Sequence, residues 1–153
     1  PICKLIENNK ITNRSVLDLC CGHGNHLKYI NKQFNSRCVG IDIRKSENWN
    51  EYESKNIHFV QQDVDNVIKN INCKKPFDII LTMNTLRGRW NDNHRDEFLI
   101  WCSKNCKYLI TNNCQNVNFN GFDLVDNIST QNENDRIFDC NLFKSKINGG
   151  VDK

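Results

Sequence analysis

Three aspartates and one glycine-rich turn stand where the sequence changes from apolar to polar. Asp18 belongs to an apolar run that ends just before Gly22 and Gly24, and Asp42 and Asp63 close two later runs. A carboxylate accepts hydrogen bonds from hydroxyl and amino groups. Glycine lets a backbone come close to a ligand, and the free amides that begin a following helix bind an anion. These residue types therefore suit a ligand that carries hydroxyl, amino and anionic groups.

The chain must supply strands whose ends meet at one edge if these groups are to act together. Apolar runs of strand length alternate with segments in which apolar residues recur at helical spacing. The expected strands are 15–20, 37–43, 56–63, 77–83 and 107–111, and the expected helices are 25–33, 64–71 and 92–106. This alternation predicts an α/β fold with a Rossmann-like, doubly wound and mostly parallel sheet. Ligands bind beyond the carboxyl ends of such strands, so the three aspartates are expected to face one crevice.

The last third of the chain follows a different pattern. Two strand candidates, 121–125 and 136–143, are separated by a polar stretch that includes residues 131–135, which predicts a C-terminal antiparallel hairpin with a long loop. The stretch 112–120 is too short and too polar for a full helix, and it is the expected flexible segment. Because the sequence shows neither an internal repeat nor a domain boundary, we expect a single domain over residues 1–153.

Four segments carry a more specific resemblance, and they do so in a fixed order. They read VLDLCCGHG at 16–24, VGIDI at 39–43, FVQQDV at 59–64 and FDIILTMN at 77–84. In this order they resemble the motifs of the class I S-adenosylmethionine-dependent methyltransferases. The resemblance spans roughly residues 15–113 and implies the class I methyltransferase fold, with S-adenosyl-L-methionine as the cofactor.

The resemblance also implies roles for the residues near the crevice. The loop 20–24 would pass beneath the methionine part of the cofactor, and Asp18 would help to hold the loop and the amino group. Asp42 would accept hydrogen bonds from both ribose hydroxyls. Asp63 would accept from the adenine amino group, and the Val64 amide would donate to the ring. The expected cofactor-binding residues are Asp18, Cys20, Cys21, Gly22, Gly24, Asn25, Asp42, Ile43, Asp63, Val64 and Asn84.

Other interpretations of the same residues stay open. A dinucleotide-binding domain also uses a glycine loop and a downstream acid, but its G-x-G-x-x-G pattern requires glycine where this chain has Leu27. An aspartate at the end of a strand is often a helix cap. The methyltransferase family itself often has glycine at the position of Cys20. Asp18 before the loop and Asp63 on a third strand favour the methyltransferase interpretation.

The segment after the fourth strand, MNTLRGRW at 83–90, is the expected place for the acceptor. It lacks the Asn-Pro-Pro-aromatic motif typical of amino methylation on DNA bases. Asn84 either orients an acceptor or caps the loop. Arg87, Arg89 and Trp90 are the candidate substrate residues, because arginine binds phosphate and aromatic rings stack on bases. The alternative is a solvated loop with Trp90 packed on the domain.

Two features are similar to those of the RNA ribose 2′-O-methyltransferases. They are the short connection between Asp42 and Asp63 and the presence of Lys4 ahead of the first motif. That family uses a Lys-Asp-Lys-Glu tetrad. Here Met83 and Asn84 replace the expected aspartate, and no lysine ends the fifth strand. The tetrad is therefore absent, that activity is not assigned, and no catalytic residue is identified.

The leading hypothesis for function is a methyltransferase whose acceptor is RNA or a small molecule. Two alternatives belong to other classes. The first is a non-catalytic, methyltransferase-like binding subunit that serves a partner subunit, and the second is an enzyme that cleaves S-adenosylmethionine.

The composition of the chain limits its expected partners and cellular compartment. The net charge of +3 gives only weak support to a nucleic-acid partner. No apolar run is long enough to span a bilayer and no signal-peptide order begins the chain, so we expect a cytoplasmic protein without a membrane partner. Nine cysteines without a C-x-x-C pair favour free thiols in a reducing compartment over a metal site built on Cys102, Cys106 and Cys114. The lack of alanine indicates an AT-rich genome, viral or from a low-GC microbe.

Overall fold

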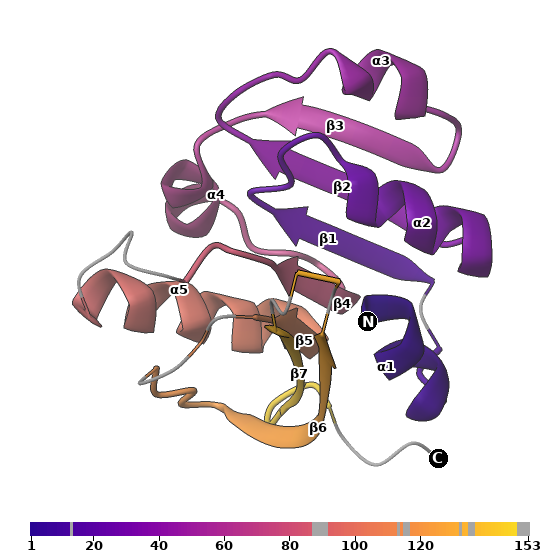
Figure 1. Ribbon diagram of the computed structural model, residues 1–153. Helices are drawn as coiled ribbons and strands as arrows, with labels where there is room; N and C mark the ends of the chain where they lie inside the picture. The colour runs from indigo at the N-terminus through magenta and orange to yellow at the C-terminus, as the bar shows by residue number, and fades with distance from the viewer. Residues whose placement is uncertain are drawn as a thin grey trace.

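The computed structural model shows a mixed sheet with helices on both of its faces (Figure 1). It describes residues 1–12, 14–86, 92–112, 114, 117–131, 133–134 and 137–149. The strands are β1 Ser15–Leu19, β2 Arg37–Asp42, β3 Ile57–Gln61, β4 Phe77–Thr82, β5 Cys106–Thr111, β6 Phe122–Gln131 and β7 Ile137–Ser145. The helices are α1 Ile2–Asn8, α2 Asn25–Phe34, α3 Asn48–Tyr52, α4 Val64–Asn70 and α5 Asp92–Asn105.

The strand order in the sheet is β3-β2-β1-β4-β5-β7-β6. Strands β1 to β5 are parallel, and β7 pairs antiparallel with both β5 and β6. In Figure 1 the arrowheads of β1, β2 and β3 point to the same edge of the sheet. Asp18 lies beside Gly40 and Leu19 beside Ile41, so the loops that follow β1 and β2 are neighbours. The predicted fold class, with its parallel sheet and C-terminal hairpin, is confirmed.

Two apolar layers hold the helices against the sheet. Successive strand residues point to opposite faces, and the buried side chains follow this alternation. One layer joins α1 and α2 to the sheet through Ile2, Leu5, Ile6, Val16, Leu27, Ile30, Cys38, Ile79 and Leu81. The other joins α4 and α5 through Leu17, Leu19, Ile41, Val64, Val67, Ile80, Phe98, Leu99, Trp101 and Cys102. The site at the strand ends is therefore carried by a sheet that is covered on both faces.

Three elements differ from the sequence-based expectation. Helix α1 was not expected, although Ile2, Leu5 and Ile6 have the spacing of a buried helical stripe. Helix α3 occupies a crossover that was expected to be too short for a full helix, and it has only five residues. Strand β6 runs through the polar residues 126–131 that were expected to begin a long loop. An edge strand with a solvent-facing side tolerates such residues, so polarity did not mark its end.

Phe59 on β3 fills the space left by two glycines beneath the first loop. A Cβ atom added at Gly24 would lie 2.5 Å from the Phe59 ring, and one added at Gly40 would lie 2.7 Å from it. The ring also stacks on Trp49 of α3, with centroids 5.1 Å apart and an interplanar angle of 7°. The absence of side chains at both glycines thus lets β2, β3 and the start of α2 approach one another.

We predict that Gly40→Ala destabilises the fold by a steric effect. The new methyl group would meet Phe59 at 2.7 Å and the Cys21 sulfur at 2.8 Å, and overpacking of this kind costs about 1–3 kcal/mol. The measurement is the free energy of unfolding from urea titration. In the Phe59→Leu background the same substitution should cost less, because the smaller side chain can yield. An equal cost in both backgrounds would contradict the proposed steric origin.

Candidate functional site

The loop between β1 and α2 has an unusual backbone. Cys20, Gly22 and Gly24 all have left-handed φ angles, of 62°, 56° and 86°. Glycine adopts this region without strain, whereas for other residues it costs about 1–2 kcal/mol. Cys20 therefore holds a conformation that glycine would hold more easily. Backbone strain of this kind clusters at ligand sites.

Asp42, at the end of β2, binds the loop directly. Its carboxylate accepts hydrogen bonds from the Gly22 amide at 2.8 Å and from the Arg44 amide at 3.0 Å. A further bond, from the Cys21 amide to the Ile41 carbonyl at 3.0 Å, joins the same two segments. The structure thus brings together the loop and the aspartate that the sequence placed on separate strands. Ile43 follows with half of its surface exposed beside the carboxylate.

Trp49 supports the loop from α3. Its indole Nε1–H donates to the Gly22 carbonyl at 2.8 Å, while its ring is buried against Phe59. Gly22 is therefore held through its amide by Asp42 and through its carbonyl by Trp49. Trp49 was not among the site residues expected from the sequence. The available signal was a tryptophan in the polar connection between two strands.

Asp18 lies beneath the loop and is fully buried. Its Oδ2 atom has no hydrogen-bond partner. Burial raises the pKa of this carboxyl well above its ordinary value, and the nearby Asp42 charge raises it further. Burial also raises the pKa of the Cys21 thiol, with the charges of Asp18 and Asp42 adding to the effect. The interior under the loop thus disfavours the ionised forms of Asp18 and Cys21, and a positive charge beside Asp18 would favour its ionised form.

The start of α2 offers backbone donors. Gly24 is the N-cap residue, and no side chain caps the helix. Asn25, the first helical residue, accepts a hydrogen bond from the Tyr52 hydroxyl at 3.0 Å. Because the first amides of a helix point along its axis, this terminus suits an anionic group.

Asp63 and Val64 stand at the end of β3. The Asp63 side chain caps α4 by accepting a hydrogen bond from the Asp65 amide at 3.0 Å, and it is otherwise exposed. Val64 is buried beneath it. The helix-cap interpretation of this aspartate is therefore confirmed. A cap uses one carboxylate oxygen, so this role is compatible with a ligand on the other.

Two asparagines close the ends of β4 and β5. The backbone N–H of Asn84 donates to Asn112 Oδ1 at 2.6 Å, and the side-chain Nδ2 of Asn112 donates back to Asn84 Oδ1 at 2.9 Å. Asn84 has a left-handed φ of 57°. Next to it, the Thr85 hydroxyl donates to the Leu19 carbonyl at 3.3 Å and so ties this turn to β1. The other residues expected to bind substrate, Arg87, Arg89 and Trp90, lie outside the described residues.

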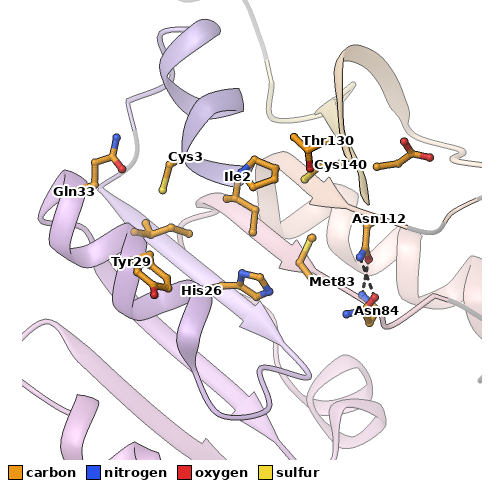
Figure 2. A pocket seen from close by; sticks show the side chains of 13 residues that line it. Ile2, Cys3, His26, Tyr29, Gln33, Met83, Asn84, Asn112, Thr130 and Cys140 are labelled. Atoms are coloured by element: carbon orange, nitrogen blue, oxygen red, sulfur yellow. Dashed lines mark hydrogen bonds between the residues drawn. The ribbon is translucent and has the colours of Figure 1, made fainter. Parts of the chain in front are cut away.

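A cavity of about 480 Å³ opens beside this asparagine pair (Figure 2). Its walls come from α1, α2, the ends of β4 and β5, and the β6–β7 hairpin. His26, one residue beyond Asn25, lines it, and partial burial lowers the pKa of its imidazole. The cavity therefore begins where the glycine loop ends.

Other site types receive no support within the described residues. Those residues contain no cluster of three or more side chains arranged to bind a metal ion. The nine cysteines, all within the described part of the chain, form no disulfide bond. Among the helices described, none is both long enough and apolar enough to cross a membrane.

Comparison with known proteins places this geometry in a family. A family profile described as "Methyltransferase domain" matches residues 16–108, more than half of the chain. A comparison with curated protein sequences found no match.

Solved structures with a similar fold include several methyltransferases. N-methyltransferase NodS from Bradyrhizobium japonicum WM9, in complex with S-adenosyl-L-homocysteine, is 13% identical with a TM-score of 0.69 over 86% of this chain and 78% of its own. Magnesium protoporphyrin IX methyltransferase from Synechocystis PCC 6803, with bound SAM, is 14% identical with a TM-score of 0.69 over 95% and 76%. A Burkholderia thailandensis 1,6-didemethyltoxoflavin-N1-methyltransferase is 11% identical with a TM-score of 0.74 over 93% and 75%. The chain belongs to the methyltransferase domain family, and its fold is the class I fold of the S-adenosylmethionine-dependent methyltransferases.

Proposed function

We propose that the chain binds S-adenosyl-L-methionine across the ends of β1, β2 and β3 and transfers its methyl group to an acceptor. The observation that carries this proposal is the hydrogen bond between the Asp42 carboxylate and the Gly22 amide. It sets a two-oxygen acceptor beside a loop whose backbone is open to a ligand. The family match and the bound SAM of a structure with the same fold support the choice of cofactor.

The residues at the strand ends fit the parts of this cofactor. A carboxylate has about four acceptor positions, and the amides of Gly22 and Arg44 occupy two of those on Asp42. The remaining positions suit two ribose hydroxyls. Asp63 and the Val64 amide suit the adenine edge, and the exposed Ile43 side chain suits its apolar face. The uncapped start of α2, at Asn25, suits the cofactor's carboxylate.

The orphaned carboxyl of Asp18 fits the positive end of the same molecule. Its charged form is destabilised by burial and by Asp42. An ammonium group held by the loop 20–24 would stabilise that form through electrostatic attraction. Asn84, at the end of β4, stands on the side where the methyl group would meet its acceptor.

The chemistry requires mainly alignment. When bound, the cofactor supplies an electrophilic methyl group, whose carbon–sulfur bond breaks as the acceptor's lone pair forms the new bond, leaving S-adenosylhomocysteine and a proton released by the acceptor. The chain contributes by holding the two reactants in line, and positioning alone lowers such a barrier by up to about 7–11 kcal/mol. The loop, held at Gly22 by both Asp42 and Trp49, provides the rigid support.

We predict that Asp42→Ala weakens binding of S-adenosylmethionine in calorimetric titration by at least about a hundredfold. Hydrogen bonds to a charged group contribute about 1.5–3 kcal/mol each, and two would be lost. The matched control is Asp123→Ala, because Asp123 is an exposed carboxylate on the edge strand, 3.8 Å from the Lys146 amino group. Unchanged affinity in a folded Asp42→Ala protein would overturn the assigned role.

The same titration, combined with assays of methyl transfer and of cofactor consumption, separates the three functional classes. Absence of binding by the folded wild-type chain would overturn the proposed function. Binding without methyl transfer to any acceptor pool would instead indicate a binding subunit. Consumption of the cofactor without an acceptor would indicate a cleaving enzyme.

We predict that Asp18→Asn changes how stability depends on pH. The raised pKa of Asp18 means that the folded state keeps its proton after the unfolded chain has lost it at an ordinary pKa of 3.8. The wild-type free energy of unfolding should therefore fall as pH rises from 3.8 toward the raised pKa. Asparagine does not ionise, so urea titrations at several pH values should show the variant gaining on the wild type as pH rises. Parallel profiles would contradict this assignment, and weaker cofactor binding by the variant would support the role of the carboxylate.

A further inference from the structure

The cavity next to the asparagine pair has a composition that restricts what can enter it. Its volume of about 480 Å³ lies within the range of about 300–1,000 Å³ that is typical of small-molecule sites. Figure 2 shows side chains from helices α1 and α2 and from the β6–β7 hairpin turned toward one space. Resting on the proposed methyl transfer, we propose that this cavity binds the methyl acceptor and that the acceptor is a small, uncharged and mostly apolar molecule.

The position of the cavity connects it to the reaction. Asn84 lines the cavity and also closes β4 at the edge where the cofactor is proposed to bind. His26 lines it two residues after Gly24, the last residue of the glycine loop. A molecule in the cavity would thus lie against the inner end of the cofactor site. The reciprocal hydrogen bonds between Asn84 and Asn112 keep that end polar and rigid, which suits the nucleophilic atom of an acceptor.

Away from the asparagines the walls are mostly apolar, with Gln33, Thr130 and Asp139 as polar members. Ile2, Ile30 and Cys140 are almost fully buried and come from three different elements. Tyr29 contributes a broad ring surface. Surfaces of this type gain free energy by covering an apolar ligand, at about 25 cal/mol per Å² of area removed from water. An uncharged hydrocarbon or heteroaromatic body is therefore the chemistry that fits these walls.

The charges of the cavity do not suit a polyanion. Among the described residues that line it, none is a lysine or an arginine. The acidic side chain among them is that of Asp139, a carboxylate that would repel a polyanion. The lowered pKa of His26 favours a neutral imidazole. Proteins bind RNA phosphates mainly through Lys and Arg, so this cavity favours a small molecule over a nucleic acid.

The test compares probes that differ in charge, on protein saturated with S-adenosylhomocysteine. The probes are indole and quinoline, the matched indole-3-carboxylate and quinoline-4-carboxylate, and a single-stranded RNA oligonucleotide. NMR titration should show the neutral compounds binding about tenfold more tightly than their carboxylates, a difference of about 1.4 kcal/mol. Absence of binding by the neutral probes, or a preference for the carboxylates, would overturn the proposal.

Two variants on one helix locate the binding. Cys3 lines the cavity, whereas Lys4, its neighbour on α1, is exposed and does not line it. Cys3→Trp should fill the cavity and weaken probe binding by about tenfold or more, while Lys4→Trp should leave it within about twofold. Equal effects of the two variants would place the probes elsewhere and overturn the proposal.

Titration with S-adenosylmethionine separates this inference from the proposed function. Both variants should bind the cofactor like the wild type, because both residues lie on α1, which supplies none of the residues of the proposed cofactor site. If the wild type failed to bind the cofactor, the proposed function itself would fail. If the cofactor bound normally but its methyl group were transferred to the RNA oligonucleotide, and Arg87→Ala abolished that transfer, only the acceptor inference would be wrong.

Discussion

The geometry of the site depends on one hydrogen bond between a strand end and a turn, from the Gly22 amide to the Asp42 carboxylate. Gly22 can take part only because the loop follows left-handed angles at Cys20, Gly22 and Gly24. Those angles turn the chain from β1 into α2 and leave the start of the helix without a side-chain cap. The carboxylate thus fixes the loop, and the loop sets the direction of the helix. Packing below the loop, by Trp49 and Phe59, keeps this arrangement from relaxing.

Two carboxyl groups of different character follow from this arrangement. Asp42 is partly exposed, and its charge is satisfied by two amides. Asp18 is buried one strand away, and one of its oxygens has no partner. The environment therefore sets a carboxylate held by two backbone amides near the surface, above a carboxyl that resists ionisation. A cationic ligand above the loop would make ionisation of Asp18 less unfavourable. Cofactor binding would thereby be linked to the stability of the domain.

Local sequence patterns predicted most of the strands and helices, but they did not predict the contacts between distant segments. The strands that carry Asp18 and Asp42, and the strand that precedes Asp63, were evident because short apolar runs in a parallel sheet need no partner to be recognised. The loop could be identified from Gly22 and Gly24 alone. By contrast, the role of Trp49 depends on a five-residue helix that the spacing did not reveal. The pairing of Asn84 with Asn112 joins residues 28 positions apart, so no local pattern contains it. The cavity likewise needs walls from both ends of the chain, which sequence periodicity does not describe.

The strand order has a consequence for the sequence of events during synthesis. The loop and Asp42 are only 20 positions apart and belong to two paired strands, so their contact closes a short segment. Strand β1 must wait longer for its other neighbour, since Val16 pairs with Ile79. The walls of the cavity are completed later still, by the hairpin strands β6 and β7 at the end of the chain. Because contacts between distant segments form more slowly than local ones, the half of the molecule that holds the loop can take shape on the ribosome before the half that closes the cavity has been made.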